Sequence, residues 1–501
     1  MATELHPPLP HKGYLDAAPQ VERGAFLLKI GHWLNRAIFV SLLSLFVLVA
    51  VPYGTVEPWW EAFFECAIFA LTALWIIEGL LLGDWNFSER ALFVPLLVLV
   101  GFALLQAMPF DKVPEQEAFW FAISADPFST LRFALKMTAL LLTGALLLSH
   151  LTNQKRLRAL ILTITLVALA SALFGMLRQT AQHEADGFLL PYLPLGAGYG
   201  QFINSNHFAY LMELSFGLPL SLLLSRSHDR EKWLLFAGLA TPLLLALVLA
   251  NSRGGLLGLC AQLLFIVLFA NQARREAYDA ASTRAMSFAR ISQAQWFRPV
   301  IGGLLIVILL IGITWVGGDP LMNKLEAVSG EVSAVGDASR EGTRRIDMWN
   351  ATWQMIAENP LLGTGFGGYA MAITQYHVAS GKLIPQQAHN EYMEVLASGG
   401  VLGAGLWLWF LLIFIRRASQ SLSAIKSPRQ RAVCVGALAG IVAVAVHSFV
   451  DFGLHLTINA LVCTALIVIV VGSPKLERSK LERPKPARMD KKLPFRLSLK
   501  V

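Results

Sequence analysis

The sequence predicts an all-α polytopic membrane protein with about twelve transmembrane helices and a large, mostly helical loop on the outer side between the ninth and tenth. Three observations carry this prediction. The 501 residues are 55% hydrophobic and only 15% charged, with a mean hydropathy of +0.56, which leaves too little polar surface for a soluble protein of this length. Apolar runs long enough to cross the hydrocarbon core recur along the chain. The basic residues collect in alternate connections between these runs.

The apolar runs define the order of the predicted crossings. They lie near 37–55, 62–83, 91–108, 131–149, 158–177, 207–224, 232–250, 254–270, 299–316, 398–415, 432–450 and 457–472. The first follows a polar, proline-containing segment, 1–36, and lacks a small-residue cleavage site, so we expect an anchor and not a cleaved signal peptide. The chain therefore divides into 37–316 with nine helices, the outer loop 317–397, and 398–472 with three helices.

The distribution of lysine and arginine predicts the orientation. Arg/Lys-rich connections occur at 150–158, 225–232, 271–298 and 416–431, and the tail 473–501 is also basic, with KLER at 475–478 and again at 480–483. With twelve crossings all five fall on one side, which predicts that both termini are cytoplasmic. We interpret the tail as a disordered extension attracted to membrane lipids and expect no nucleic-acid partner.

The predicted outer loop 317–397 is too long for a plain connector. Its best helix is 344–357, where Ile346, Trp349, Trp353 and Ile356 form an apolar stripe at helical spacing and Pro360 limits the helix. The run GTGFGGY (363–369) follows a helix end and not a strand, so we predict a glycine-rich turn and not a nucleotide-binding loop.

Polar side chains gather where several predicted helices meet the outer side. They are His389, Asn390, Glu391 and Glu394 before helix ten, Asn204, Asn206, His207, Tyr210 and Glu213 at helix six, Arg253 between helices seven and eight, His447 and Asp451 at the end of helix eleven, and Arg344 and Arg345 in the loop. Each has an ordinary explanation: Asn206 and Ser252 are possible N-caps, and His447 with Asp451 is a possible local i,i+4 pair. Their common depth favours a shared cavity between helices.

Such a cavity suits a particular kind of transfer. Arginine binds a phosphate or diphosphate bidentately. Histidine titrates near neutral pH and can take a proton from an acceptor hydroxyl. The pairing fits a reaction in which a diphosphate leaves and a hydroxyl attacks. The sequence has no Asp-x-Asp and no convincing His/Cys cluster, and its four cysteines lie inside apolar runs, so neither a metal nor a cofactor is predicted.

These motifs resemble the O-antigen ligase superfamily, which also contains Wzy-type polymerases and bacterial protein O-oligosaccharyltransferases. The clearest match is His389-Asn390, then nine residues, Gly400, two residues and Gly403. NSRGGLLG (251–258) looks like the family's Ser-Arg-Gly turn, and 344–369 is similar to its helix and glycine-rich turn. INSNHFAYLMEL (203–214) and HSFVDFGLH (447–455) resemble motifs of one branch. The resemblance covers roughly 200–460.

The resemblance implies a metal-independent membrane glycosyltransferase that takes a glycan from polyprenyl (undecaprenyl) diphosphate on the periplasmic side of the inner membrane. By that resemblance His389 activates the acceptor hydroxyl, Arg253 holds the diphosphate, and Arg345 or Arg344 adds a second contact. One departure concerns the branch's Asn-Arg-Asn-His, which here reads Asn204-Ser205-Asn206-His207, so an arginine is missing.

The acceptor stays open at this stage. A ligase passes a finished chain to lipid A–core, whereas a Wzy-type O-antigen or exopolysaccharide polymerase passes it to a second lipid-linked glycan. We favour the ligase narrowly, and protein O-glycosylation is the third acceptor choice. A lipid-linked glycan transporter or flippase is the rival class, because twelve helices with both ends inside is a common transporter layout. Against it, no two halves of the sequence align as repeats. A non-enzymatic scaffold leaves the outer polar groups unexplained.

Overall fold

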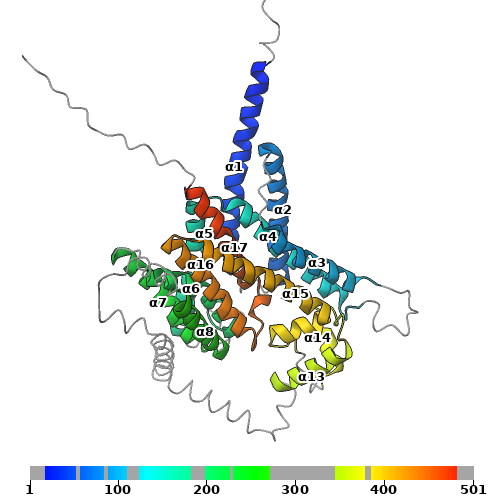
Figure 1. The fold of residues 1–501 in the computed structure, drawn as a ribbon. Helices are drawn as coiled ribbons and strands as arrows, with labels where there is room; N and C mark the ends of the chain where they lie inside the picture. The colour runs from blue at the N-terminus through cyan, green and yellow to red at the C-terminus, as the bar shows by residue number, and fades with distance from the viewer. Residues whose placement is uncertain are drawn as a thin grey trace, which may run out of the picture.

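The computed structural model describes residues 17–51, 57–83, 89–109, 123–181, 198–225, 230–270, 345–377 and 385–481. Within these ranges the chain forms helices and no strand, which confirms the all-α class (Figure 1). The helices of eight residues or more are α1 (Ala17–Ala50), α2 (Pro58–Leu82), α3 (Arg90–Ala107), α4 (Pro127–His150), α5 (Gln154–Ala181), α6 (Ser205–Leu224), α7 (Arg230–Leu249), α8 (Arg253–Ala270), α13 (Arg345–Glu358), α15 (Glu391–Ala424), α16 (Pro428–His447) and α17 (Thr457–Leu481). The short helices are α14 (Tyr369–Ala372), η2 (Ile373–Gln375) and η3 (Gly453–His455).

Eleven of the twelve predicted crossings coincide with helices. Ten of these helices are long and apolar enough to span a membrane, and α8 is apolar but slightly shorter. The ninth predicted crossing, 299–316, lies outside the described residues, as does most of the first half of the predicted outer loop. The protein is therefore a multi-pass membrane protein, and the number twelve stays a prediction.

Several helices extend beyond the predicted apolar runs. α1 begins at Ala17, α15 begins at Glu391, and α17 continues to Leu481, whereas α16 ends at His447 and not at residue 450. The reason is that a helix ends at its cap and not where its hydrophobicity ends. Asn390 caps α15 by accepting hydrogen bonds from the backbone N–H groups of Tyr392 and Met393, each at 3.1 Å.

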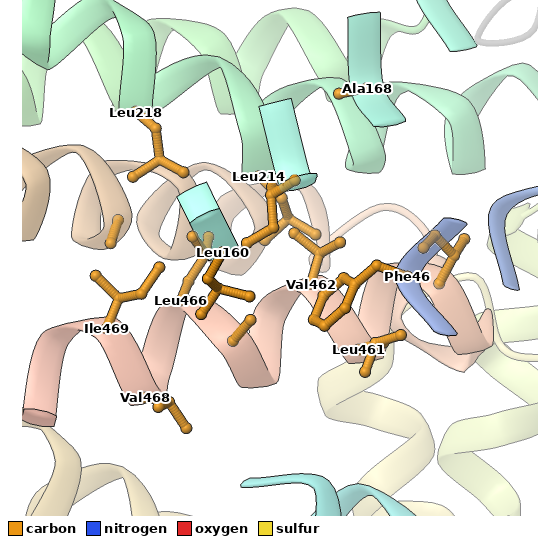
Figure 2. Close-up of a cluster of buried hydrophobic side chains, with 14 of the residues drawn as sticks. Phe46, Leu160, Ala168, Leu214, Leu218, Leu461, Val462, Leu466, Val468 and Ile469 are labelled. Atoms are coloured by element: carbon orange, nitrogen blue, oxygen red, sulfur yellow. The ribbon is translucent and has the colours of Figure 1, made fainter. Parts of the chain in front are cut away.

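The interior of the bundle is built on α6, α16 and α17. In the α6 span 83% of the residues are buried inside the protein, against 22% in the α2 span, so α2 presents most of its surface to lipid. Figure 2 shows the apolar contacts of α17 with α1, α5 and α6; the labelled side chains are Phe46, Leu160, Ala168, Leu214, Leu218, Leu461, Val462, Leu466, Val468 and Ile469. Since lipid is as apolar as these side chains, close packing and not dehydration holds the helices together.

Glycines allow α6 and α16 to approach at backbone distance. A Cβ atom at Gly436 would lie 2.5 Å from the Gly217 carbonyl oxygen, and one at Gly217 would lie 2.3 Å from the Gly436 carbonyl oxygen. Gly440 meets the backbone of Leu214 in the same way, at 2.7 Å. Small residues on both helices therefore set the spacing at the centre of the bundle.

We expect Gly436→Leu to separate α6 from α16. Overpacking of a well-packed interior typically costs about 1–3 kcal/mol, and backbone contacts on the facing helix cannot move aside as a side chain can. Thermal unfolding of the purified protein in detergent should therefore fall clearly below wild type. Gly101→Leu is the control, since no atom lies within 4 Å of a Cβ atom there. Equal unfolding temperatures for the two variants would contradict the prediction.

The predicted glycine-rich turn and the residues just before it hydrogen-bond to α15 where that helix is interrupted. Gly400 has a φ of 59°, which interrupts the helix. The backbone of the turn supplies partners there: Gly365 N–H donates to the Ser398 carbonyl at 2.9 Å, and Val401 N–H donates to the Pro360 carbonyl at 2.8 Å. A Cβ atom at Gly400 would lie 2.3 Å from the Leu361 carbonyl oxygen, and one at Gly403 would lie 2.8 Å from the Phe366 ring. Both glycines of the quoted motif are thus required by contact with this turn.

The helix predicted at 344–357 is present as α13, but its predicted apolar stripe is partly wrong. Ile356 is buried and Trp349 half-buried, whereas Trp353 is 61% exposed. The face that packs inward carries Met348, Thr352 and Met355, which are all buried. The neighbours decide this: Thr352 Oγ1 lies 2.7 Å from the Tyr369 hydroxyl, and Trp349 Nε1–H donates to the Ala388 carbonyl at 3.0 Å.

Candidate active site

Six elements bring polar side chains to one end of the bundle, which the charge pattern predicts to be the outer end. α6, α8, α15 and α17 begin there and α16 ends there, with η3 in the connection between α16 and α17. Predicted residues from three separate segments, 204–213, 389–394 and 447–451, therefore meet there, in two layers. The upper layer surrounds Asp451 and the lower layer surrounds His447.

Asp451 is the centre of the upper layer. It is fully buried, and its Oδ1 lies 3.4 Å from His389 Nδ1 and 3.8 Å from His207 Nε2. The amide of Asn206 donates to its other oxygen. One carboxylate from the α16–α17 connection thus faces three side chains from two other segments. His389 is the more accessible of the two histidines, with 28% of its side chain exposed against 9% for His207.

The surroundings keep the Asp451 carboxylate charged. Burial by itself would raise its pKa, but the polar contacts and charges of His207 and His389 outweigh burial and hold the pKa of Asp451 well below its ordinary value. The carboxylate therefore stays ionised at neutral pH and is protonated only when the pH falls through this lowered pKa.

Phe452 lies among three histidines. Its ring centroid is 4.7 Å from that of His207, 4.7 Å from that of His389 and 5.9 Å from that of His455, each in an edge arrangement. His389 itself has a φ of 49°, a left-handed conformation that is uncommon for a residue with a side chain. Such backbone strain persists only where neighbouring contacts determine it, and it clusters at functional sites.

The lower layer joins α6, α8 and α16. His447 Nδ1 lies 3.1 Å from Glu213 Oε1, and both side chains are fully buried. His447 Nε2 lies 3.5 Å from Ser252 Oγ, which also accepts from the Gly255 N–H at 3.0 Å. The ring of Tyr210 lies tilted against that of His447, with centroids 4.1 Å apart. Tyr210 and Glu213 thus contribute to this layer.

The alternative reading of His447 and Asp451 as a local i,i+4 pair is wrong. α16 ends at His447, and residues 448–450 form a turn, so Asp451 is not on that helix. The two side chains belong to different layers. The N-cap reading holds for Ser252 but not for Asn206, because Asn204 accepts from the Asn206 N–H at 2.9 Å and caps α6.

The side chains of Asn390, Glu391 and Glu394 accept hydrogen bonds from backbone N–H groups near His389. Asn390 caps α15, as described above. Glu391 Oε1 accepts from the Leu454 N–H at 3.0 Å, and Glu394 Oε2 accepts from the Ala388 N–H at 2.9 Å. All three therefore fix the backbone around His389.

The positions of the predicted diphosphate-binding arginines follow from the backbone segments that carry them. Arg253 is exposed at the start of α8, between Ser252 and Gly254. A Cβ atom at Gly254 would lie 2.4 Å from His447 Nε2, so this turn packs directly on the lower layer. Arg345 begins α13, the helix whose Trp349 reaches Ala388 beside His389, and its side chain is not described. Arg344 lies outside the described residues.

A comparison with known protein families identifies the segment that contains these residues. Residues 238–408 match the family described as O-antigen ligase, a segment that includes Arg253, Arg345 and His389. Residues 238–408 therefore form an O-antigen ligase segment. No curated protein matches the sequence. The family implies an enzyme with glycosyltransferase activity of the ligase or polymerase type, which uses lipid-linked glycan and lipid A–core in general.

His207, Asp451 and the lower-layer histidine lie outside the O-antigen ligase segment, yet they pack around it. Sequence reasoning missed two more residues at this end, His455 and Lys136. His455 closes the quoted HSFVDFGLH, and Lys136 is a charge inside an apolar run, which is a recognised signal of a special role.

Two further observations concern metal binding and cavities. Within the described ranges no group of three or more His, Cys, Asp or Glu side chains is arranged to hold a metal ion. A polar cavity of about 170 Å³ lies between α13 and η2, and its lining residues are Glu358, Asn359, Thr364, Ala372, Gln375 and Tyr376. His389 is not among them, so the cavity is separate from the Asp451 layer.

Proposed function

We propose that this protein transfers a glycan from polyprenyl (undecaprenyl) diphosphate to a hydroxyl of lipid A–core, on the periplasmic side of the inner membrane. The observation that carries the proposal is His389, an accessible histidine held by a buried carboxylate within the O-antigen ligase segment. A histidine oriented in this way is the usual form of a general base, since the carboxylate fixes its tautomer and supports its charge.

The proposed roles follow the geometry of the histidine. Nδ1 faces Asp451, so Nε2 is the nitrogen that takes the proton of the acceptor hydroxyl. The acceptor oxygen then forms a bond to the anomeric carbon of the first sugar, and the bond from that carbon to the diphosphate breaks. The electron pair of the broken bond leaves with polyprenyl diphosphate, and the proton stays on His389.

The leaving diphosphate needs positive charge. Arg253 supplies this positive charge in the proposal. Its side chain is exposed at the start of α8, where backbone N–H groups also favour an anion. Arg345, or Arg344 in its place, is proposed as the second contact from the outer segment. Asn206 and His207 complete the site by holding Asp451 in position.

The polymerase is the second candidate. In that case the acceptor is a second lipid-linked glycan, and the same His389 and Arg253 chemistry applies. Transfer to protein hydroxyls and movement of lipid-linked glycan without chemistry remain the less favoured alternatives. In each transfer reaction the family match supports the lipid-linked donor equally.

The test of the proposal is a comparison of Arg253→Ala with Arg253→Lys. We expect the alanine variant to lose about 10²- to 10³-fold in transfer, because removal of one group that stabilises developing charge has effects of this size. The lysine variant should recover part of the loss, since it keeps the charge without the bidentate geometry. The measurement is transfer from host lipid-linked glycan to lipid A–core by protein in liposomes. Full transfer by Arg253→Ala would remove the central element of the proposal.

A further inference from the structure

His455 contacts two carboxylates of α15 at once. It lies at the end of η3, and its Nε2 is 3.4 Å from Glu391 Oε2 and 3.5 Å from Glu394 Oε1. The two glutamates are one helical turn apart, so a single imidazolium can bridge them. Glu391 and Glu394 side chains are 14% and 9% exposed, which limits the access of competing water.

The second oxygen of each carboxylate holds the backbone on both sides of the site. Glu394 Oε2 accepts from Ala388 N–H, directly before His389, and Glu391 Oε1 accepts from Leu454 N–H, directly before His455. The Glu391 N–H in turn donates to the Ser448 carbonyl at 3.0 Å. The contacts of His455 therefore lead to Ala388, directly before the strained residue His389, and to the connection that carries Asp451.

We infer that His455 is a positioning residue: its imidazolium bridges Glu391 and Glu394 and thereby holds His389 in the left-handed conformation that directs its ring to Asp451. This inference rests on the proposed function of His389. It extends the site beyond the O-antigen ligase segment, which ends at residue 408.

The first half of the chain extends this network. Lys136 of α4 donates to the His455 carbonyl at 2.6 Å and lies 2.7 Å from Glu61 Oε1 of α2. Arg132 of α4 lies 3.0 Å from Glu61 Oε2. The charged groups around His455 are thus Glu391 and Glu394 from α15 and Lys136 from α4, with Glu61, Glu65 and Arg132 behind Lys136. The carboxylates nearest the imidazole outnumber the cations.

This surplus of negative charge keeps the imidazole protonated. Burial by itself would lower the pKa of His455, but the charges of Glu394 and Glu391 outweigh burial and the opposing Lys136, and the pKa rises to about 9. Because the pKa in the folded protein is raised, the bridge is complete below the ordinary pKa of histidine. It is lost as the pH rises through about 9.

The experiment measures kcat and KM for His455→Ala and His455→Lys in liposomes with host lipid-linked glycan and lipid A–core. We expect His455→Ala to lower kcat by about 10- to 100-fold, because a displacement of about 1 Å at a catalytic group costs up to 10²-fold. KM for the donor should stay near wild type, since Arg253 is on another helix. His455→Lys should restore much of kcat, and its rate should persist above pH 9, where the wild-type rate falls.

Hydrogen exchange gives a readout that does not depend on activity. The segment around Ala388 should exchange faster in His455→Ala than in wild type, while α6 and α16 exchange as before. A wild-type kcat in His455→Ala would overturn the inference. So would a loss of kcat that His455→Lys does not restore, if exchange at Ala388 in His455→Ala is the same as in wild type. His32→Ala, an exposed histidine on α1, is the matched control. Full activity of His389→Ala would instead overturn the proposed function itself, so the two failures are distinguishable.

Discussion

Replacement of His389 by alanine is expected to abolish glycan attachment in the native host. Loss of a general base typically lowers a rate by about 10²- to 10⁴-fold, and the Asp451 carboxylate alone cannot replace it because it is fully buried. The measurement is the glycan pattern of the host on a gel, beside an immunoblot that confirms normal amounts of the variant in the membrane. The side chain is partly exposed and lies at the end of the bundle, so we expect the variant to fold.

The same gel distinguishes the two candidate reactions. Long lipid-linked chains that accumulate without attachment indicate a ligase, and single repeat units indicate a polymerase. His32→Ala serves as the control and should leave the pattern unchanged. An unchanged pattern in His389→Ala would mean that Asn390 and its neighbours form only a well-capped start of α15, and the transporter would become the leading class.

The largest effect on stability is expected at the opposite end of the bundle, at Glu78. This carboxylate is buried and accepts from the Asn35 amide at 2.6 Å, and its other oxygen lies 2.8 Å from His150 Nε2. Arg156 joins the cluster by donating to the Asn35 side-chain oxygen at 2.5 Å and to the His150 carbonyl at 2.7 Å. Four helices, α1, α2, α4 and α5, thus meet at one charge network.

We expect Glu78→Ala to destabilise the protein by about 3–5 kcal/mol, because it leaves both the Asn35 amide and the buried His150 ring without a partner, at about 1–3 kcal/mol for each such group. Unfolding in mixed micelles measures the change. Glu231→Ala, which removes an exposed carboxylate from α7, should stay within about 0.5 kcal/mol of wild type. A loss below about 1 kcal/mol for Glu78→Ala would mean that the network is no stronger than a surface ion pair.

The residues that sequence reasoning found and missed at the outer end differ in a physical way. His389, Asp451 and His207 were found because polar side chains beside apolar runs are costly and therefore conspicuous. The pairing of Asp451 could not be predicted, because it depends on where α16 ends, and that end is set by a turn at 448–450. His455 was passed over since its partners, Glu391 and Glu394, are more than sixty residues away in the chain.

The sequence by itself determined the class of protein and the positions of its membrane helices. Twenty or so apolar residues in a row can satisfy their backbone groups in lipid only as a helix, so composition and run length decide this locally. Only the tertiary structure decided which polar side chains face each other, which face of α13 packs inward, and why Gly400 and Gly403 must be glycines. These depend on contacts between distant segments: Gly400 is required by the backbone of Leu361 and Gly403 by the ring of Phe366, and no local pattern in α15 contains either contact.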